Sequence, residues 1–310
     1  MTETRYDEVG RAEFTSAPFA PSGPPDGVLW SGPLNAMLAV NQTIYDNASR
    51  PTDTILLGRH INGDDSVILT EKWRTHTDYT GDTVRVTPPS GGVSTTTVSD
   101  AQGRTTELRQ HTTTDGVNGP YQATSYTYNR KDQLVAITDP DNNEWIYTYD
   151  VKGRQTQAND PDKGITVSTY NDYNDLTETR AANGKAISYT YDKLGRKTHQ
   201  YDNSNPATPK LAARWKYDKV DIRFGGQTVR GQTTEATRYE PAGSTNAYQQ
   251  LFTNFTVRNQ PGGVTYIIPA AETGLNASWS LGYGYSEFDG SPISVKYPTA
   301  GALDSEEVIT

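Results

Sequence analysis

The segment EWIYTYD, residues 144–150, alternates between two kinds of side chain with a period of two. Trp145, Tyr147 and Tyr149 fall on one face, whereas Ile146 and Thr148 fall on the other. This alternation predicts a half-buried β-strand and does not fit the 3.6-residue period of a helix. The strand is followed by VKGR, which contains a turn-forming glycine. The segment therefore indicates a strand that ends in a tight turn.

This strand-and-turn pattern repeats. The nonapeptide YTYDVKGRQ (residues 147–155) returns forty-two residues later as YTYDKLGRK (residues 189–197). Tyrosines recur at an uninterrupted spacing of twenty-one residues, at Tyr128, Tyr149, Tyr170 and Tyr191. Asn or Asp follows each of them, at Asn129, Asp150, Asn171 and Asp192. A fixed period of about twenty residues indicates one supersecondary unit per repeat.

The position four residues after each tyrosine indicates how the chain turns. It holds Asp132, Gly153, Asn174 and Gly195. Gly, Asn and Asp are the residues that best tolerate positive φ, so we expect a left-handed conformation at this position. The Asp or Asn three residues earlier can cap the turn through its side chain. Arg154 and Arg196 come next and begin the following strand.

A second turn lies midway through each period. TDPDNNE (138–144), NDPDKGI (159–165) and AANGKA (181–186) occupy equivalent positions and contain strong turn dipeptides. Each period therefore reads strand, turn, strand, turn, with about six or seven residues per strand. The predicted fold class is all-β, made of repeated antiparallel hairpins that follow one another as a spiralling ribbon.

The repeat is regular in only part of the chain. We expect three regions, namely a degenerate repeat region at 1–97, a regular array at 98–218, and a second degenerate region at 219–310. No segment after Val295 resembles an effector domain, so we expect a fragment or a partial structure.

Composition favours an ordered chain with an unusual core. Only 33% of residues are hydrophobic, which by itself is typical of disorder. The 20 tyrosines and 5 tryptophans favour half-buried strands instead. We expect a core built from tyrosine and Thr, Val or Ile more than from leucine.

Charge and missing residue types exclude several classes of protein. The net charge is −9 without any Lys/Arg run, which disfavours nucleic-acid binding. There is no cysteine for disulfides or thiolate metal sites. No apolar stretch approaches the length of a membrane span, and the N-terminus does not resemble a signal peptide.

Once the repeat is aligned, Tyr-Asp-x-x-Gly-Arg resembles the YD repeats of the Rhs family, which also occur in the C subunit of insecticidal toxin complexes and in teneurins. Partial matches occur at 45–50 and 99–104, and residues 72–110 look like actinobacterial Rhs proteins. The full matches are Tyr6, Asp7, Gly10 and Arg11; Tyr149, Asp150, Gly153 and Arg154; and Tyr191, Asp192, Gly195 and Arg196.

The resemblance implies a ribbon that winds into a hollow shell around a C-terminal toxin or effector of the parent protein. It also implies an immunity protein or delivery machinery as partners, and a secreted or cell-surface location as part of a longer protein. Open ribbon edges could pair with another chain, so we expect some self-association. The Asp-Pro-x-Gly-Leu motif that ends toxin-releasing Rhs cores is absent, because Asp139-Pro140 and Asp160-Pro161 continue differently.

Catalytic and metal-binding signals are weak. His60, His76, His111 and His199 are scattered, and we expect them to be surface or lumen residues without a catalytic role. No hydrolase or nucleotide-binding motif appears, so we expect no enzyme activity and no cofactor. Asp139, Asp141, Asn143 and Asp150 have EF-hand-like spacing, but Glu144 stands where the loop needs Gly. A polar hairpin turn explains them more simply than calcium does.

Two further interpretations concern the aromatic and arginine side chains. We expect Arg154 and Arg196 to form ion pairs with the motif aspartates or with carboxylates of neighbouring strands. Trp145, Tyr147 and Tyr189 form a candidate aromatic ligand face. The leading hypothesis is a structural segment of a toxin-encapsulating shell. Two alternatives stay open, a cell-surface glycan-binding or adhesion protein and a carbohydrate-active enzyme.

Overall fold

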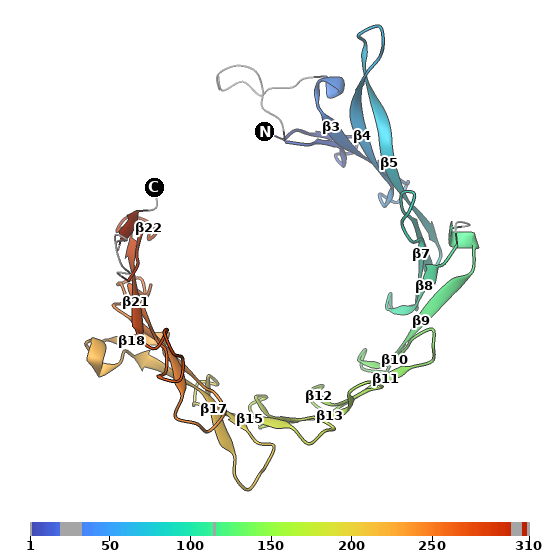
Figure 1. Cartoon of the computed structure of the whole chain (residues 1–310). Helices are drawn as coiled ribbons and strands as arrows, with labels where there is room; N and C mark the ends of the chain where they lie inside the picture. The colour runs from blue at the N-terminus through green and yellow to red at the C-terminus, as the bar shows by residue number, and fades with distance from the viewer. Residues whose placement is uncertain (1, 19–32, 114–115, 299–305, 309–310) are drawn as a thin grey trace. The chain divides into compact units, whose positions relative to one another are not determined.

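The computed structural model describes the chain apart from residues 1, 19–32, 114–115, 299–305 and 309–310. The chain forms two compact units, residues 1–145 and 146–310. The described regular structure is almost entirely strand (Figure 1). The described residues otherwise hold three short 3₁₀ turns, which are η1 (Leu34–Ala36), η2 (Gly116–Asn118) and η3 (Ile222–Phe224).

In the first unit each strand pairs antiparallel with the strands before and after it in the chain, from the first strand to the tenth. The strands are β1 (Thr4–Tyr6), β2 (Ala12–Ser16), β3 (Ala39–Tyr45), β4 (Pro51–Ile61), β5 (Val67–Thr80), β6 (Thr83–Thr87), β7 (Thr95–Ser99), β8 (Thr105–His111), β9 (Tyr121–Tyr128) and β10 (Leu134–Thr138).

The second unit has the same topology. Its first strand, β11, begins at Glu144, just before the boundary between residues 145 and 146. Its strands are β11 (Glu144–Tyr149), β12 (Gln155–Asp160), β13 (Gly164–Tyr170), β14 (Leu176–Arg180), β15 (Ala186–Tyr191), β16 (Lys197–Asp202), β17 (Lys210–Lys219), β18 (Thr228–Tyr239), β19 (Ala247–Thr253), β20 (Gly263–Ile267), β21 (Ser278–Tyr285), β22 (Pro292–Lys296) and β23 (Glu306–Val308). All twelve successive pairs from β11 to β23 are antiparallel. The prediction of an all-β chain of repeated antiparallel hairpins is confirmed.

The regular array is made of short strands, as the sequence predicts. Strands β11 to β16 are five to seven residues long and are joined by short turns. A register shift, or β-bulge, accompanies the motif turn in each of the pairs β11–β12, β13–β14 and β15–β16. Bulges of this kind bend a strand and increase its twist. The three regions expected from repeat regularity stay a prediction.

Buried residues are few in both units. In the first unit they include Met37, Val40 and Ile55, and in the second unit most of them lie between β17 and β20. Val220, Val229 and Phe255 form a cluster with Phe224 and Phe252 packed against it. Leu251 is 0% exposed, and several threonines on the same strands are also buried. In the described residues no tyrosine falls in the buried class, so the tyrosine part of the expected core is wrong, whereas buried Val and Thr outnumber buried Leu as expected. The tyrosines have another use, because their hydroxyls and ring faces contact the turns.

Candidate functional site

The motif turn after β11 has two backbone bonds and a side-chain cap. The Asp150 amide donates to the Arg154 carbonyl at 2.9 Å, and the Gly153 amide donates to the Asp150 carbonyl at 3.1 Å. The Asp150 Oδ1 atom accepts from the amides of Lys152 at 2.9 Å and Arg154 at 3.0 Å. The same arrangement recurs in the turns that begin at Asp7, Asp46, Asp100, Asn129, Asn171 and Asp192.

The fourth turn position is left-handed in every regular copy. The φ angles are 62° at Asp132, 87° at Gly153, 73° at Asn174 and 73° at Gly195. Gly10 of the first motif copy has φ 84°. The prediction of positive φ at this position is therefore confirmed, and it explains why Gly, Asn or Asp stands there in the regular copies, whereas Ser49 takes φ 61° in the turn at Asp46.

The motif arginine is bound to the motif aspartate, as expected. Arg154 Nε donates to Asp150 Oδ2 at 2.6 Å, and Arg196 Nε donates to Asp192 Oδ2 at 2.7 Å. Arg11, Arg50 and Arg104 make the same pair with Asp7, Asp46 and Asp100. Where the first residue is Asn, its amide donates to the residue at the arginine position, which is Gln133 or Asp175. An amide bond thus replaces the ion pair in those copies.

The arginine also reaches the next repeat. Arg154 Nη1 donates to the Asn171 carbonyl at 2.8 Å, and its guanidinium carbon lies 4.7 Å from the centre of the Tyr170 ring. The Tyr170 hydroxyl returns a hydrogen bond to the Gln155 carbonyl at 2.9 Å. A guanidinium over a tyrosine ring at this distance is a cation–π contact. We call this pair of side chains, one motif arginine and the tyrosine of the following repeat, the turn clamp.

The turn clamp recurs in both units. A motif arginine lies 4.3 to 4.8 Å from the next tyrosine ring in Arg11–Tyr45, Arg50–Tyr79, Arg104–Tyr128, Arg154–Tyr170 and Arg196–Tyr217. The tyrosine hydroxyl donates to the carbonyl just after the preceding turn in Tyr45–Ala12, Tyr79–Pro51, Tyr170–Gln155, Tyr191–Leu176, Tyr217–Lys197 and Tyr285–Pro261. These six tyrosines therefore close the turn of the repeat before them.

Two clamps carry an additional carboxylate. Arg104 Nη1 lies 2.6 Å from Asp132 Oδ1, and Arg196 donates to both oxygens of Asp218 at 2.9 and 2.6 Å. The hydrogen bond from Arg196 and the amide of Gly231 lower the pKa of Asp218 to about 2. The amide and guanidinium of Arg154 likewise lower the pKa of Asp150, and the Arg196 side chain is the main cause that lowers the pKa of Asp192. These carboxylates are therefore ionised at neutral pH.

The expected aromatic ligand face is spread over the second half of the array. Trp145, Tyr147 and Tyr189 are all half-buried. Strands β12, β13 and β14 lie between Tyr147 on β11 and Tyr189 on β15. Lys197 Nζ lies 3.7 Å from the centre of the Tyr189 ring, so this ring already has a cationic partner. Their role as a ligand face stays a prediction.

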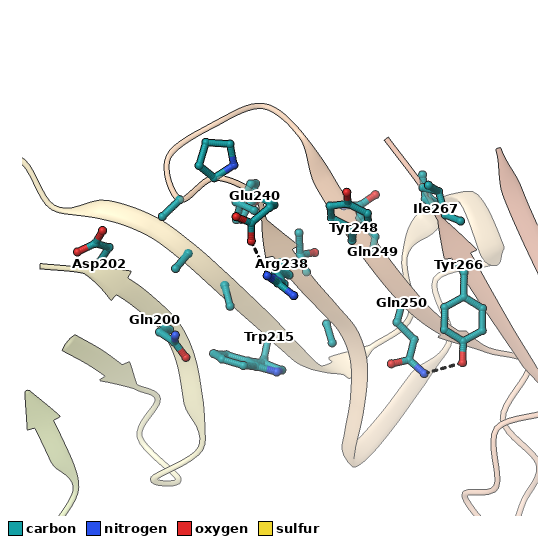
Figure 2. A pocket seen from close by; sticks show the side chains of 18 residues that line it. Gln200, Asp202, Trp215, Arg238, Glu240, Tyr248, Gln249, Gln250, Tyr266 and Ile267 are labelled. Carbon is teal, nitrogen blue, oxygen red and sulfur yellow. Dashed lines mark hydrogen bonds and ion pairs between the residues drawn. The ribbon is translucent and has the colours of Figure 1, made fainter. Parts of the chain in front are cut away.

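A groove of about 970 Å³ lies on the face of β16 to β20 in the second unit (Figure 2). Trp215, Ala236, Gln250 and Tyr266 stand in register on four successive strands. A second row contains Gln200, Ala213, Arg238 and Tyr248. The groove therefore has small alanines between aromatic side chains, with amides beside them.

Sequence reasoning missed this groove. Its strands lie largely beyond the regular array, and its residues come from positions 200 to 268. The only signal in the sequence was alternation around Trp215 and Tyr266, and no spacing rule relates these two residues. Strand pairing, which brings them into one row, could not be read from a repeat that has lost its period.

The histidines are placed in three different ways. His60 is exposed, and His76 Nδ1 lies 3.0 Å from Asp53 Oδ1. His199 Nδ1 lies 3.1 Å from the Thr190 hydroxyl. His111 is 5% exposed and contacts the Thr96 hydroxyl and the Gly119 carbonyl. The expectation that all four lie at a surface or lumen is therefore wrong for His111.

The calcium-like segment forms a capped turn. Asp139 Oδ1 accepts from the amides of Asp141 at 2.9 Å and Asn143 at 2.8 Å, and Asp139 Oδ2 accepts from the Asn143 side chain. Within the described ranges, no group of three or more His, Cys, Asp or Glu side chains is arranged to hold a metal ion. In the same part of the chain, no helix has the length and apolar content of a membrane crossing.

Known proteins share both the repeat and the fold. Residues 128–165 match the family model RHS Repeat, and no curated protein matches the chain. A crystal structure of TcdB2-TccC3-TEV is similar to it with a TM-score of 0.55, at 14% identity over 94% of this chain and 18% of that one. The Tc holotoxin pore of Photorhabdus luminescens has a TM-score of 0.49, at 16% identity over 99% of this chain and 18% of that one.

The chain thus spans about a fifth of the length of these structures. The first of them shows that the all-β architecture is shared, and the matched segment contains the turns at Asn129 and Asp150. Residues 128–165 therefore contain an RHS repeat, and the capped turn of that repeat recurs outside the matched segment, for example at Asp7 and Asp192.

Proposed function

We propose that this chain is a wall segment of an Rhs/YD shell that encapsulates a C-terminal toxin or effector of its parent protein and helps deliver it. Its contribution is structural, because the polar side chains of the recurring motif are used for turn caps and clamps. The toxin is the proposed partner, with an immunity protein or delivery machinery acting on the parent, and the proposed location is secreted or cell-surface.

The turn clamp is the observation that carries this proposal. A two-stranded hairpin is unstable by itself, so a wall of hairpins needs contacts that hold each one to its neighbours. The backbone ladder supplies one such contact along the strands, and the clamp supplies another at the turns, through Arg154 and Tyr170 for example. A sheet held in this way can remain continuous with little fully buried core.

The likeness to the TcdB2-TccC3-TEV structure supports the same role, since a chain that matches 18% of that structure fits a segment of a larger wall. Confinement is then a physical barrier. An effector inside the wall is kept from proteases and targets until the wall opens.

The test is limited proteolysis of the full parent protein, with an immunoblot for its C-terminal region. We expect this region to resist proteinase K in the native protein and to be cleaved quickly after urea treatment. The double variant Arg154→Ala/Arg196→Ala should lose protection at lower urea than the wild type. Arg130→Ala is the matched control, because Arg130 lies at an exposed turn position outside any clamp.

Encapsulation is supported if the C-terminal region resists proteinase K in the native parent protein and is cleaved after urea treatment. Equal cleavage of that region in native and urea-treated parent protein contradicts it, as does a parent gene that encodes no further segment after the repeats. Circular dichroism of the variants separates a loosened wall from an unfolded one.

A further inference from the structure

One rim of the second unit presents an exposed apolar side chain at each of its turns. Successive strands pair antiparallel from β11 to β22, so the connections that follow β11, β13, β15, β17, β19 and β21 lie on the same rim of the sheet. We call this rim, made of residues 150–154, 171–175, 192–196, 220–227, 254–262 and 286–291, the motif rim. In chain order its connections carry Val151, Tyr173, Leu194, Ile222, Val257 and Phe288, which are 74% to 101% exposed.

The fold of these turns does not require apolar side chains. Turn positions favour Gly, Asn, Asp and Ser, which suit the turn backbone or cap it. In the first unit, the turns after β3, β7 and β9 have Ala48, Gln102 and Lys131 at the position that holds Tyr173 and Leu194. The unbroken apolar row is therefore a property of the second unit. Large apolar side chains that gather on one exposed side of a protein indicate a contact surface.

The spacing of the row restricts what can contact it. Neighbouring connections on the motif rim are two strands apart, which corresponds to about 9.5 Å. Single side chains at this distance do not join into one continuous patch, so a partner must offer apolar side chains at the same interval. A ribbon built from the same hairpin repeat has this interval. A second copy of this chain is such a ribbon.

The charges beside the apolar side chains alternate along the row. In chain order the six connections are positive, negative, positive, balanced, positive and negative in their exposed charged side chains. Lys152 and Arg258 donate to backbone carbonyls of the next connection, which do not neutralise their charge. The charged side chains in this order are Lys152, Asp172, Lys193, the Arg223–Asp221 ion pair, Arg258, and Glu287 with Asp289.

This order of charges fits a two-fold axis across the rim. A two-fold axis reverses the direction of the second copy, so the first connection faces the sixth, the second faces the fifth and the third faces the fourth. Positive then faces negative in the two outer pairs, and Lys193 faces the balanced pair. Opposite charges that face each other across an interface fix its register and disfavour other arrangements. If each connection faced its own equivalent instead, like charges would meet.

We propose that the motif rim of the second unit binds the same rim of a second copy of this chain about a two-fold axis. The contacts that leave water are the apolar pairs Val151–Phe288, Tyr173–Val257 and Leu194–Ile222, each made between the two copies and each made twice. Lys152 faces the partner's Glu287. The contact uses turn side chains, so it differs from pairing through the open strand edges at β1 and β23. It does not rest on the shell role.

The test is sedimentation velocity of the purified 310-residue chain over a wide range of concentrations. We expect a monomer–dimer equilibrium. Lys152→Glu and Glu287→Lys should each weaken the dimer about tenfold, because like charges then face each other across the rim. The double variant Lys152→Glu/Glu287→Lys should recover most of the wild-type affinity, since opposite charges face each other again. Phe288→Ser, which removes an apolar contact twice per dimer, should also weaken it about tenfold.

Two matched controls lie outside the row. Val9→Ser removes a 72% exposed side chain from a motif turn of the first unit. Lys163→Glu reverses an exposed charge on the opposite rim of the second unit, in the turn between β12 and β13. Both should leave the dimer affinity unchanged. Unaltered circular dichroism and urea midpoint show that a variant is folded.

Four results would overturn the proposal. The first is a chain that stays monomeric at every concentration. The second is a dimer that the folded variants Lys152→Glu and Phe288→Ser leave unchanged, which would assign self-association to the open strand edges. The third is a folded charge-swap double variant that dimerises no better than either single variant. The fourth is a monomer that co-sediments with phosphatidylcholine vesicles and no longer does so in Phe288→Ser, which would make the rim a lipid-binding surface.

Discussion

Two parts of the second unit are stabilised by different kinds of contact. In the array from β11 to β16, Ala186 is the one buried residue of the described chain between 146 and 202. Successive repeats are joined there by the Arg154–Tyr170 clamp and by the hydrogen bond from the Tyr191 hydroxyl to the Leu176 carbonyl. From β17 to β20 an apolar cluster and a buried Leu251 appear, and the 21-residue period is lost. Strict repetition is therefore needed where turns and ladders hold the sheet, and it relaxes where side chains pack into a core.

The largest expected effect separates the two parts by core packing. Leu251→Ala should lower the free energy of unfolding by about 2–5 kcal/mol, because it leaves a cavity in a fully buried position. Ile187→Ala on β15 should cost much less, since Ile187 is 41% exposed. Urea denaturation followed by circular dichroism measures both. Equal losses of unfolding free energy in the two variants would contradict this difference in core packing.

The next effect concerns the left-handed turn position. Gly195→Ala should cost roughly 1–2 kcal/mol, since φ is 73° and an L-residue is strained there. The added Cβ would meet only Asp175 Oδ1 at 3.7 Å, so the cost comes from the backbone and not from a clash. Gly195→Asn is the control and should cost less, because Asn174 has the same φ in the neighbouring turn. Thermal or urea unfolding compares the two variants, and identical losses would contradict the backbone explanation.

A smaller effect tests the clamp itself. Tyr217→Phe removes the hydrogen bond to the Lys197 carbonyl but keeps the ring under Arg196, so stability should fall by about 1 kcal/mol. Tyr173→Phe should change nothing measurable, since Tyr173 is 87% exposed at a turn tip. A urea midpoint that shifts equally in both variants would show that the tyrosine hydroxyl does not hold the clamp.

The smallest expected effect is on pH dependence. The pKa of Asp218 is about 2 in the folded chain, below its ordinary value of 3.8, so the stability it contributes is present above pH 3.8 and is lost as pH falls toward 2. The urea midpoint should therefore fall between pH 4 and pH 2. Asp218→Asn should lower the midpoint at neutral pH and make this acid-side slope shallower. An unchanged slope would contradict the role of the Arg196–Asp218 pair.

Much of the array could be predicted from the sequence. The strand in 144–149, the left-handed Gly153 and Gly195, and the pairs Asp150–Arg154 and Asp192–Arg196 all depend on residues within a few positions of each other. Local spacing determines such features, because turn geometry and side-chain caps act over four or five residues. The same reasoning was wrong about the tyrosines, since their hydroxyl partners lie about 15 to 33 residues earlier.

The amino-acid sequence by itself determined the period, the turn chemistry and the alternation that makes the chain a series of hairpins. The tertiary structure decided which repeat each arginine and tyrosine contacts, where an apolar core forms, and which side chains surround the groove. The physical reason is distance along the chain. Trp215, Gln250 and Tyr266 meet only because β17 to β20 pair in one register, and strand pairing is set by the whole ladder of hydrogen bonds rather than by any local motif.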